Sequence, residues 1–277
     1  VAAMAQLAAL AVAEQAAKRA IQLDPTLGEP YAALGKIAME AGRAAEATDY
    51  FRRALALEPN NALVHDWYGD LCVGQGRLDV AIAEYRRALE LEPLSPYILW
   101  DLAWELLHVR RFEESLALVD RAIALTPAGS PRLALRRARL LVELGRQAEA
   151  ATALKSFLST IATETDPQFA NELVWALRAT GSAAESERWA KEFVQHYPDS
   201  PASGVIWVML GDLEKAYPLL EKTPMIFHQQ IYWESIFDPL RGTPRFQQLL
   251  DKLGCADAYQ VARDTRDRLL REYAAQK

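Results

Sequence analysis

The sequence predicts an all-α protein, an α-solenoid of repeated helical hairpins closed by a C-terminal helical cap. Two observations carry this prediction. Alanine and leucine dominate the 277 residues and β-branched runs are scarce, which favours helix. Three columns of identical residues also recur every 34 positions, and a period of this length indicates two-helix units that stack on their neighbours. The columns are Pro25, Pro59, Pro93 and Pro127; Leu23, Leu57, Leu91 and Leu125; and Ala20, Ala54, Ala88 and Ala122.

Residues 28–61 form the clearest copy of the unit. Small residues at Gly35, Ala47 and Ala54 let two helices approach closely, and a large side chain there would overpack the contact at a cost of about 1–3 kcal/mol. Gly42 supplies the turn between the helices, where a left-handed backbone suits glycine. Pro59 ends the unit because proline cannot continue a helix interior.

A 34-residue period with these small residues resembles the tetratricopeptide repeat (TPR) family, in which each repeat is a pair of antiparallel helices. The matching positions are Gly35, Gly69 and Ala103; Ala47, Ala81 and Ser115; and Phe51, Tyr85 and Val119. The resemblance implies a right-handed superhelix whose concave side is lined by the first helix of every repeat. It also implies binding of proteins or peptides rather than catalysis.

The register of the columns divides the chain into an array over residues 1–232 and capping helices over 233–277. The expected repeats are 28–61, 62–95, 96–129, 130–164, 165–198 and 199–232, with a polar connector at 159–166. Residues 1–27 are expected to be a partial first repeat, because Val1 falls inside the repeat and the chain starts without Met; a longer, irregular N-terminal helix is the alternative. Arg110 stands where the turn glycine belongs, so we expect a less standard turn there.

The closing segment at 233–254 has its own signals. Thr243 is an expected N-cap with Pro244 at the first helical position, and Phe246, Leu249, Leu250 and Leu253 form one apolar stripe. This segment resembles the one that closes the repeat domains of bacterial multidomain regulators, namely winged-helix transcriptional activators and class III adenylate cyclases. The resemblance implies the regulatory or sensing part of a larger bacterial protein.

Composition excludes several classes of function. A formal net charge of −6 argues against direct nucleic-acid binding, which needs a basic surface. No stretch has the roughly 20 apolar residues of a membrane span, and the N-terminus lacks the basic region of a signal peptide. Two distant cysteines fit a reducing compartment, so we favour the cytoplasm over the periplasm.

No catalytic, cofactor or metal motif is found. The four histidines stand in different repeats without the spacing of paired ligands, and the glycines fall singly at turns rather than in a phosphate loop. Cys72 occupies a packing position and is expected to be a buried, inert thiol, whereas Cys255, after the Gly254 helix stop, is expected to be more exposed. We therefore expect neither an enzyme nor a cofactor.

The remaining functional surface is the groove. Trp, Tyr and Arg, which dominate binding hot spots, gather at its expected inward positions. An alternative is that some of these aromatic residues pack between helices. The wider inward set includes Asp66. The expected groove residues are Lys36, Trp67, Asp70, Tyr97, Trp100, Trp104, His108, Arg132, Arg136, Arg139, Asn171, Trp175 and Arg178.

The expected partner is a protein or peptide segment held in that groove. Some repeat proteins clamp a C-terminal carboxylate with Lys, Asn and Arg residues. At the aligned places this chain has Ala32, Lys36, Trp67, Tyr97 and Asp101, so that mode is not expected. An acidic or C-terminal peptide held in a different geometry by Arg132, Arg136 and Arg139 is an alternative. Three further alternatives are a sensor of a small anionic ligand, an enzyme on a repeat scaffold, and a self-assembling scaffold that forms a homo-oligomer through its N-terminal end.

Overall fold

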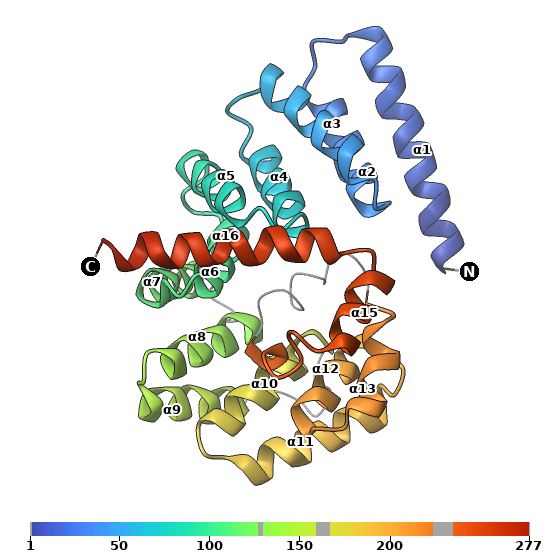
Figure 1. Cartoon of the computed structure of the whole chain (residues 1–277). Coiled ribbons are helices and arrows are strands. Elements are labelled where there is room, and N and C mark those ends of the chain that lie inside the picture. The colour runs from blue at the N-terminus through green and yellow to red at the C-terminus, as the bar shows by residue number, and fades with distance from the viewer. Residues whose placement is uncertain (1, 127–129, 159–166, 224–234, 277) are drawn as a thin grey trace. The chain divides into compact units, whose positions relative to one another are not determined.

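A computed structural model describes residues 2–126, 130–158, 167–223 and 235–276, and every regular element over these ranges is helical (Figure 1). The chain divides into two compact units, residues 1–93 and 94–277. Each unit is described by itself. The expected connector at 159–166 and the end of the last expected repeat lie outside the described residues.

The first unit contains one long helix and two hairpins. Its helices are α1 (Ala2–Leu23), α2 (Glu29–Glu40), α3 (Ala44–Leu57), α4 (Ala62–Gly74) and α5 (Leu78–Leu91). Helix α2 packs on α3 and α4 packs on α5, while α1 lies against α2. Residues 2–23 form one continuous helix of 22 residues, longer than the second helix of either hairpin.

In each of the two hairpins of the first unit, an aromatic ring on the second helix packs against a glycine on the first helix. A Cβ atom on Gly35 would lie 2.7 Å from the ring of Phe51, and one on Gly69 would lie 2.6 Å from the ring of Tyr85. Both rings are almost completely buried. The glycines therefore set the distance between the two helices of each hairpin.

The second unit continues the hairpin pattern. Its helices are α6 (Pro96–His108), α7 (Phe112–Ala124), α8 (Pro131–Glu143), α9 (Gln147–Leu158), α10 (Pro167–Ala179), α11 (Ala183–His196), α12 (Pro201–Leu210) and α13 (Leu213–Leu220). Consecutive helices pair as α6 with α7, α8 with α9, α10 with α11 and α12 with α13. Serine caps with proline at the first helical turn start α6, α8 and α12, so the sequence marks where these helices begin.

The turns between paired helices use a left-handed residue. Gly42, Gly76 and Gly145 have φ values of 75°, 74° and 75°. Arg110 takes the same place between α6 and α7 with a φ of 59°, so this turn keeps the repeat geometry without a glycine. The expectation of a less standard backbone geometry in this turn was wrong. The absence of glycine has an energetic cost instead, because a non-glycine residue is strained in the left-handed conformation.

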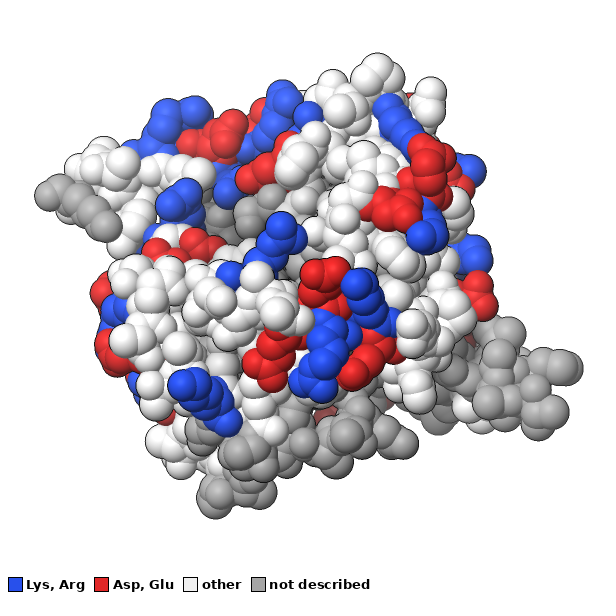
Figure 2. All heavy atoms as spheres, turned by 90° about the horizontal axis from the view of Figure 1, so that it is seen from below, with Lys and Arg blue, Asp and Glu red and all other residues white. Residues whose placement is uncertain are grey.

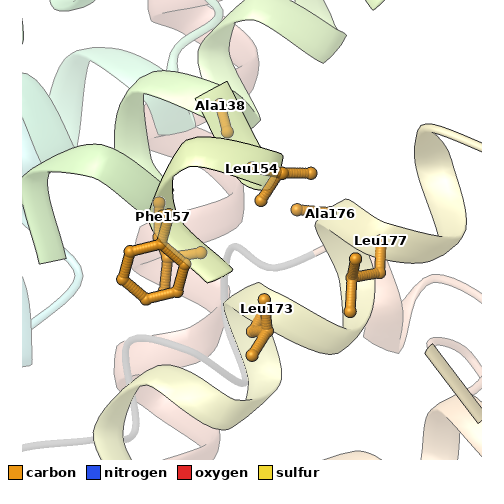
Figure 3. Packing of buried hydrophobic residues seen from close by; sticks show 7 residues of the cluster. Ala138, Leu154, Phe157, Leu173, Ala176 and Leu177 are labelled. Carbon is orange, nitrogen blue, oxygen red and sulfur yellow. The ribbon is translucent and has the colours of Figure 1, made fainter. Parts of the chain in front are cut away.

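Apolar residues from three helices form a core cluster of the second unit (Figure 3). Ala138 of α8, Leu154 and Phe157 of α9, and Leu173 and Leu177 of α10 are all buried. The hairpin of α8 and α9 thus shares a core with the first helix of the next hairpin, as stacking of repeats requires.

The C-terminal segment comprises η2 (Ser235–Phe237), α15 (Pro244–Lys252) and α16 (Ala256–Ala274). Thr243 is the N-cap of α15, as predicted, since its hydroxyl accepts a hydrogen bond from the amide of Phe246. Helix α15 is tied to α13 by ion pairs of Arg245 with Glu214 and of Lys252 with Glu221.

Cys255 corrects an expectation, because its side chain is buried rather than exposed. Gly254, with a φ of 65°, turns the chain back after α15. The Cys255 amide then donates to the Leu250 carbonyl at 3.0 Å, which places the side chain at the junction between α15 and α16.

Candidate functional site

Helix α6 of the second unit presents a row of aromatic rings. Trp100, Trp104 and His108 are four residues apart, so they share one face of the helix. The two indole rings lie nearly parallel with centroids 6.0 Å apart, and His108 meets Trp104 edge-on at 5.1 Å. This row is one half of a tryptophan–arginine stack.

Helix α8 supplies the other half with three arginines. The guanidinium of Arg132 lies 5.5 Å from the ring centroid of Trp100, and that of Arg136 lies 4.4 Å from Trp100 and 3.0 Å from Trp104. Arg139 lies 5.9 Å from Trp104 and 5.2 Å from Trp175 of α10. Cation–π contacts therefore connect three successive first helices, α6, α8 and α10.

Arg136 also forms an ion pair inside the protein. Its Nε lies 2.9 Å from Oε1 of Glu172 on α10, and both side chains are buried, with 2% and 9% exposed. The charge of Arg136 is therefore neutralised within the chain. Arg139 is buried as well.

The other predicted residues of this unit lie in different surroundings. Tyr97 is 80% exposed. Arg178 is exposed and donates to the Met209 carbonyl at 2.8 Å. His108 is buried beside Glu105 at 3.2 Å, and Asn171 is partly buried. The structure thus brings the tryptophans and the α8 arginines together and leaves Tyr97 outward.

The three predicted residues of the first unit lie together. The Lys36 ammonium of α2 is 3.9 Å from Oδ2 of Asp70 on α4 and 5.5 Å from the ring centroid of Trp67. Asp70 also accepts a hydrogen bond from the Tyr85 hydroxyl at 2.9 Å. All of Lys36, Trp67 and Asp70 are partly exposed.

Asp66 completes this group, which we call the Asp66 site: Lys36, Asp66, Trp67, Asp70 and Tyr85. Asp66 is only 9% exposed, and its Oδ1 has no hydrogen-bond partner among the described residues. Burial, together with the nearby Asp70 carboxylate, raises the pKa of Asp66 to about 7, while Lys36 opposes the shift. The repeat register predicts an inward position for Asp66, but Asp66 is not among the predicted binding residues; its spacing of four from Asp70 on one helix was the available signal.

An open depression of about 550 Å³ lies elsewhere on the first unit. It is lined by Glu58, Asn60, Asn61 and Glu92 together with Pro59 and Ala62. Glu92 also raises the pKa of Asp66 through its charge, so its negative potential extends to the Asp66 site. The polar lining of this depression is thus acidic and amide groups.

Two observations bear on metal and thiol chemistry in the part of the chain that the structure describes. No group of three or more His, Cys, Asp or Glu residues there could hold a metal ion. Burial raises the pKa of the Cys72 thiol to about 11, so this side chain is a thiol rather than a reactive thiolate at neutral pH. No helix among the described residues is both long and apolar enough to cross a membrane.

Surface charge is mixed on the face shown in Figure 2, where Lys and Arg side chains alternate with Asp and Glu. Exposed ion pairs such as Arg188–Glu192 and Lys191–Glu187 on α11 have this character. This face carries no continuous basic patch.

Stacked helical hairpins whose first helices carry aromatic and charged side chains define a class of helical-repeat interaction scaffolds. Within that class, the family model described as tetratricopeptide repeat matches residues 32–97 and 100–167. These residues are therefore tetratricopeptide repeats, and proteins of this kind are generally non-catalytic scaffolds for protein interaction.

Solved structures extend the same fold over most of the chain. A tetratricopeptide repeat protein from Parabacteroides merdae superposes with a TM-score of 0.65 and 16% identity, over 90% of this chain and 94% of that one. PilF of Pseudomonas aeruginosa gives a TM-score of 0.58 and 19% identity, over 72% and 89%. PilW, a type IV pilus biogenesis factor, gives 0.57 and 19%, over 68% and 86%. No curated protein matches the chain.

Proposed function

We propose that this chain is a non-catalytic module that binds a segment of a partner protein along the first helices of its hairpins. The observation that carries the proposal is the side-chain content of these helices. Lys36, Trp67 and Asp70 come from two successive first helices; Lys36 contacts both Trp67 and Asp70, and all three keep part of their surface open to solvent. Aromatic and charged groups with residual exposure are the usual anchors of protein interfaces.

The anionic-ligand alternative has weaker support. It needs arginines with uncommitted charge, but Arg136 is paired with Glu172 and stacked on two tryptophans. Arg139 is buried between Trp104 and Trp175. In this arrangement the arginines act mainly as connections between hairpins.

Two further properties of the chain are proposed, a regulatory role and self-assembly. We propose a regulatory role within a larger protein on the basis of the sequence pattern at 233–254 alone. Self-assembly through the N-terminal end is the second candidate arrangement, and exposed apolar residues on α1, such as Val12 with 68% exposed, support it. Light scattering after size exclusion would separate a monomer from a homo-oligomer.

A library of random peptides displayed on phage tests the binding function. We expect enriched peptides for the native chain and at least a tenfold loss of their affinity in a Trp67→Ala, Asp70→Ala double variant, given roughly 1.4 kcal/mol per tenfold change. The matched control is Arg87→Ala with Glu90→Ala, an exposed ion pair on the second helix α5. Absence of enrichment, or equal binding by both double variants, would refute the proposal.

A further inference from the structure

Asp66 is an unusual group for a packed helical repeat. Its carboxylate is nine-tenths buried on α4, yet Oδ1 receives no hydrogen bond from the described residues. A buried polar atom without a hydrogen-bond partner is energetically unfavourable. A ligand that supplies a donor to this oxygen would recover that cost on binding.

The surroundings of Asp66 favour a cationic donor. Asp70 lies one helical turn away on the same face, and Glu92 adds a further negative potential. Lys36 opposes this potential and lies 3.9 Å from Asp70, but it donates no hydrogen bond to the Asp66 Oδ1. The site therefore combines an excess of carboxylates with an acceptor that still lacks a donor.

A cationic side chain fits this site better than a metal ion. Calcium and magnesium ions take about six or more oxygen ligands, and zinc usually takes about four ligands. No group of three or more His, Cys, Asp or Glu residues among the described residues could hold a metal ion, and Lys36 would repel one. A guanidinium offers five N–H donors in a plane, suits carboxylates and stacks on aromatic rings. Trp67 is partly exposed and provides such a ring; it lies 5.5 Å from the Lys36 ammonium, which is itself 3.9 Å from Asp70 Oδ2.

We propose that the Asp66 site binds an arginine side chain of the partner segment, with Asp66 and Asp70 accepting its N–H groups and Trp67 packing against its plane. This inference rests on the proposed function and adds the chemistry of the partner. Asp66 forms the buried end of the site, while Asp70 and Lys36, with side chains 36% and 27% exposed, form its open side. The partner segment is thus basic at the first unit, opposite in charge to the acidic peptide that the α8 arginines suggested.

The test uses N-acetyl-L-arginine amide as the probe and N-acetyl-L-citrulline amide as its neutral control of the same shape. The readout is the indole N–H signal of Trp67 in a two-dimensional NMR spectrum, assigned with a Trp67→Phe variant. We expect a saturable shift with the arginine probe and about tenfold weaker binding of the citrulline probe, as a lost charge-assisted hydrogen bond implies. Asp66→Asn should weaken arginine binding similarly.

Asp49→Asn is the matched control variant, since Asp49 is an exposed aspartate on α3 of the same unit. It should bind the arginine probe like the native chain. Equal binding of both probes, no shift with arginine, or an unchanged affinity in Asp66→Asn would each overturn the inference.

The peptide selection described above separates this inference from the general function. Enriched peptides that lack Arg and Lys, with affinity lost in the Trp67→Ala, Asp70→Ala variant, would leave the binding function standing and refute the arginine site. Arginine binding without any enriched peptide would support the arginine site and refute the general peptide-binding function.

Discussion

Tyr85 covers Gly69 so closely that a Cβ atom on the glycine would lie 2.6 Å from the ring carbon Cε1. The ring is 2% exposed, and its hydroxyl donates to Asp70, so it cannot move aside without breaking that bond. The same contact, between Gly35 and Phe51, recurs one repeat earlier. In the third hairpin, Ala103 stands at the position of the glycine and Val119 at the position of the aromatic residue. The larger residue on the first helix is thus matched by a smaller residue on the second helix.

Gly69→Ala should therefore lower the free energy of unfolding by about 1–3 kcal/mol through overpacking. Gly74→Ala on the same helix is the control, because a Cβ atom there meets nothing within 4 Å. The control should be neutral or slightly stabilising, owing to the better helix propensity of alanine. Urea denaturation measures both variants; equal stabilities would contradict the packing role of Gly69.

Arg110 holds a left-handed backbone conformation that favours glycine, with a φ of 59°. Arg110→Gly should raise the free energy of unfolding by about 1 kcal/mol, because the strain of a non-glycine residue is relieved. Gly145→Ala makes the opposite change in the next turn, where φ is 75° and the space is open, and should cost about the same amount. Thermal unfolding followed by circular dichroism would detect both; a destabilised Arg110→Gly would show that its side-chain contacts outweigh the strain.

Removing one partner of the buried pair between Arg136 and Glu172 should be severe. Arg136→Ala leaves the Glu172 carboxylate without its cation and should cost about 3–5 kcal/mol. Arg137→Ala on the same helix breaks a more exposed pair with Asp120 and should cost no more than about 1 kcal/mol. Replacing both Arg136 and Glu172 by leucine should restore part of the stability, and a double variant worse than Arg136→Ala would contradict this account.

Asp66 should make stability depend on pH. Its folded pKa of about 7 lies above the ordinary value of 3.8, so the folded protein holds this proton more tightly than the unfolded chain. The stabilising contribution is complete below the ordinary pKa and is lost as the pH rises to about 7, with a slope of at most roughly 1.4 kcal/mol per pH unit. Burial is the main cause of the raised pKa; the charges of Asp70 and Glu92 add to it, and the charge of Lys36 opposes it.

The difference between the native chain and Asp66→Asn isolates this effect, because all other groups titrate in both. We expect the variant to gain stability relative to the native chain as the pH rises from about 4 to 7, and the difference to be constant above that range. Urea denaturation at several pH values provides the measurement. Parallel curves for the two proteins would mean that Asp66 has an ordinary pKa.

Local patterns were sufficient to predict most of the fold. The 34-residue columns predicted the hairpins. Thr243 caps α15 through a hydrogen bond of its own hydroxyl to a nearby amide, and Gly42 turns the chain through its own left-handed backbone, so both roles could be predicted without the tertiary structure. Arg110 shows where this reasoning failed. The surrounding helices impose the turn geometry on whatever residue stands there, which residue preference alone does not reveal.

The candidate site was only partly predictable because helical position does not determine partners. Arg136 and Tyr97 were both assigned inward, yet one is buried against Glu172 and the other is 80% exposed. The division of the chain after Pro93 was likewise not visible, since the proline column continues through it. The burial of Arg136, the exposure of Tyr97 and the division of the chain depend on which side chains contact one another between hairpins. The repeat register gives the position of a residue in its helix but not its contacts in the neighbouring hairpin.

The hydrogen bond from Arg266 of α16 to the His108 carbonyl joins residues 158 positions apart, and Arg111 lies over the ring of Tyr273 at 5.4 Å. A linear repeat array folds by adding neighbours, each step closing only a short loop. Here the last helix, α16, contacts the first hairpin of its unit. The contacts between α16 and this hairpin join residues far apart in sequence, so we expect them to form late in folding. These long-range contacts raise the contact order, so we expect slower folding than for an array with neighbour contacts alone. We also expect the final step of folding to be cooperative, because it joins the two ends of the unit.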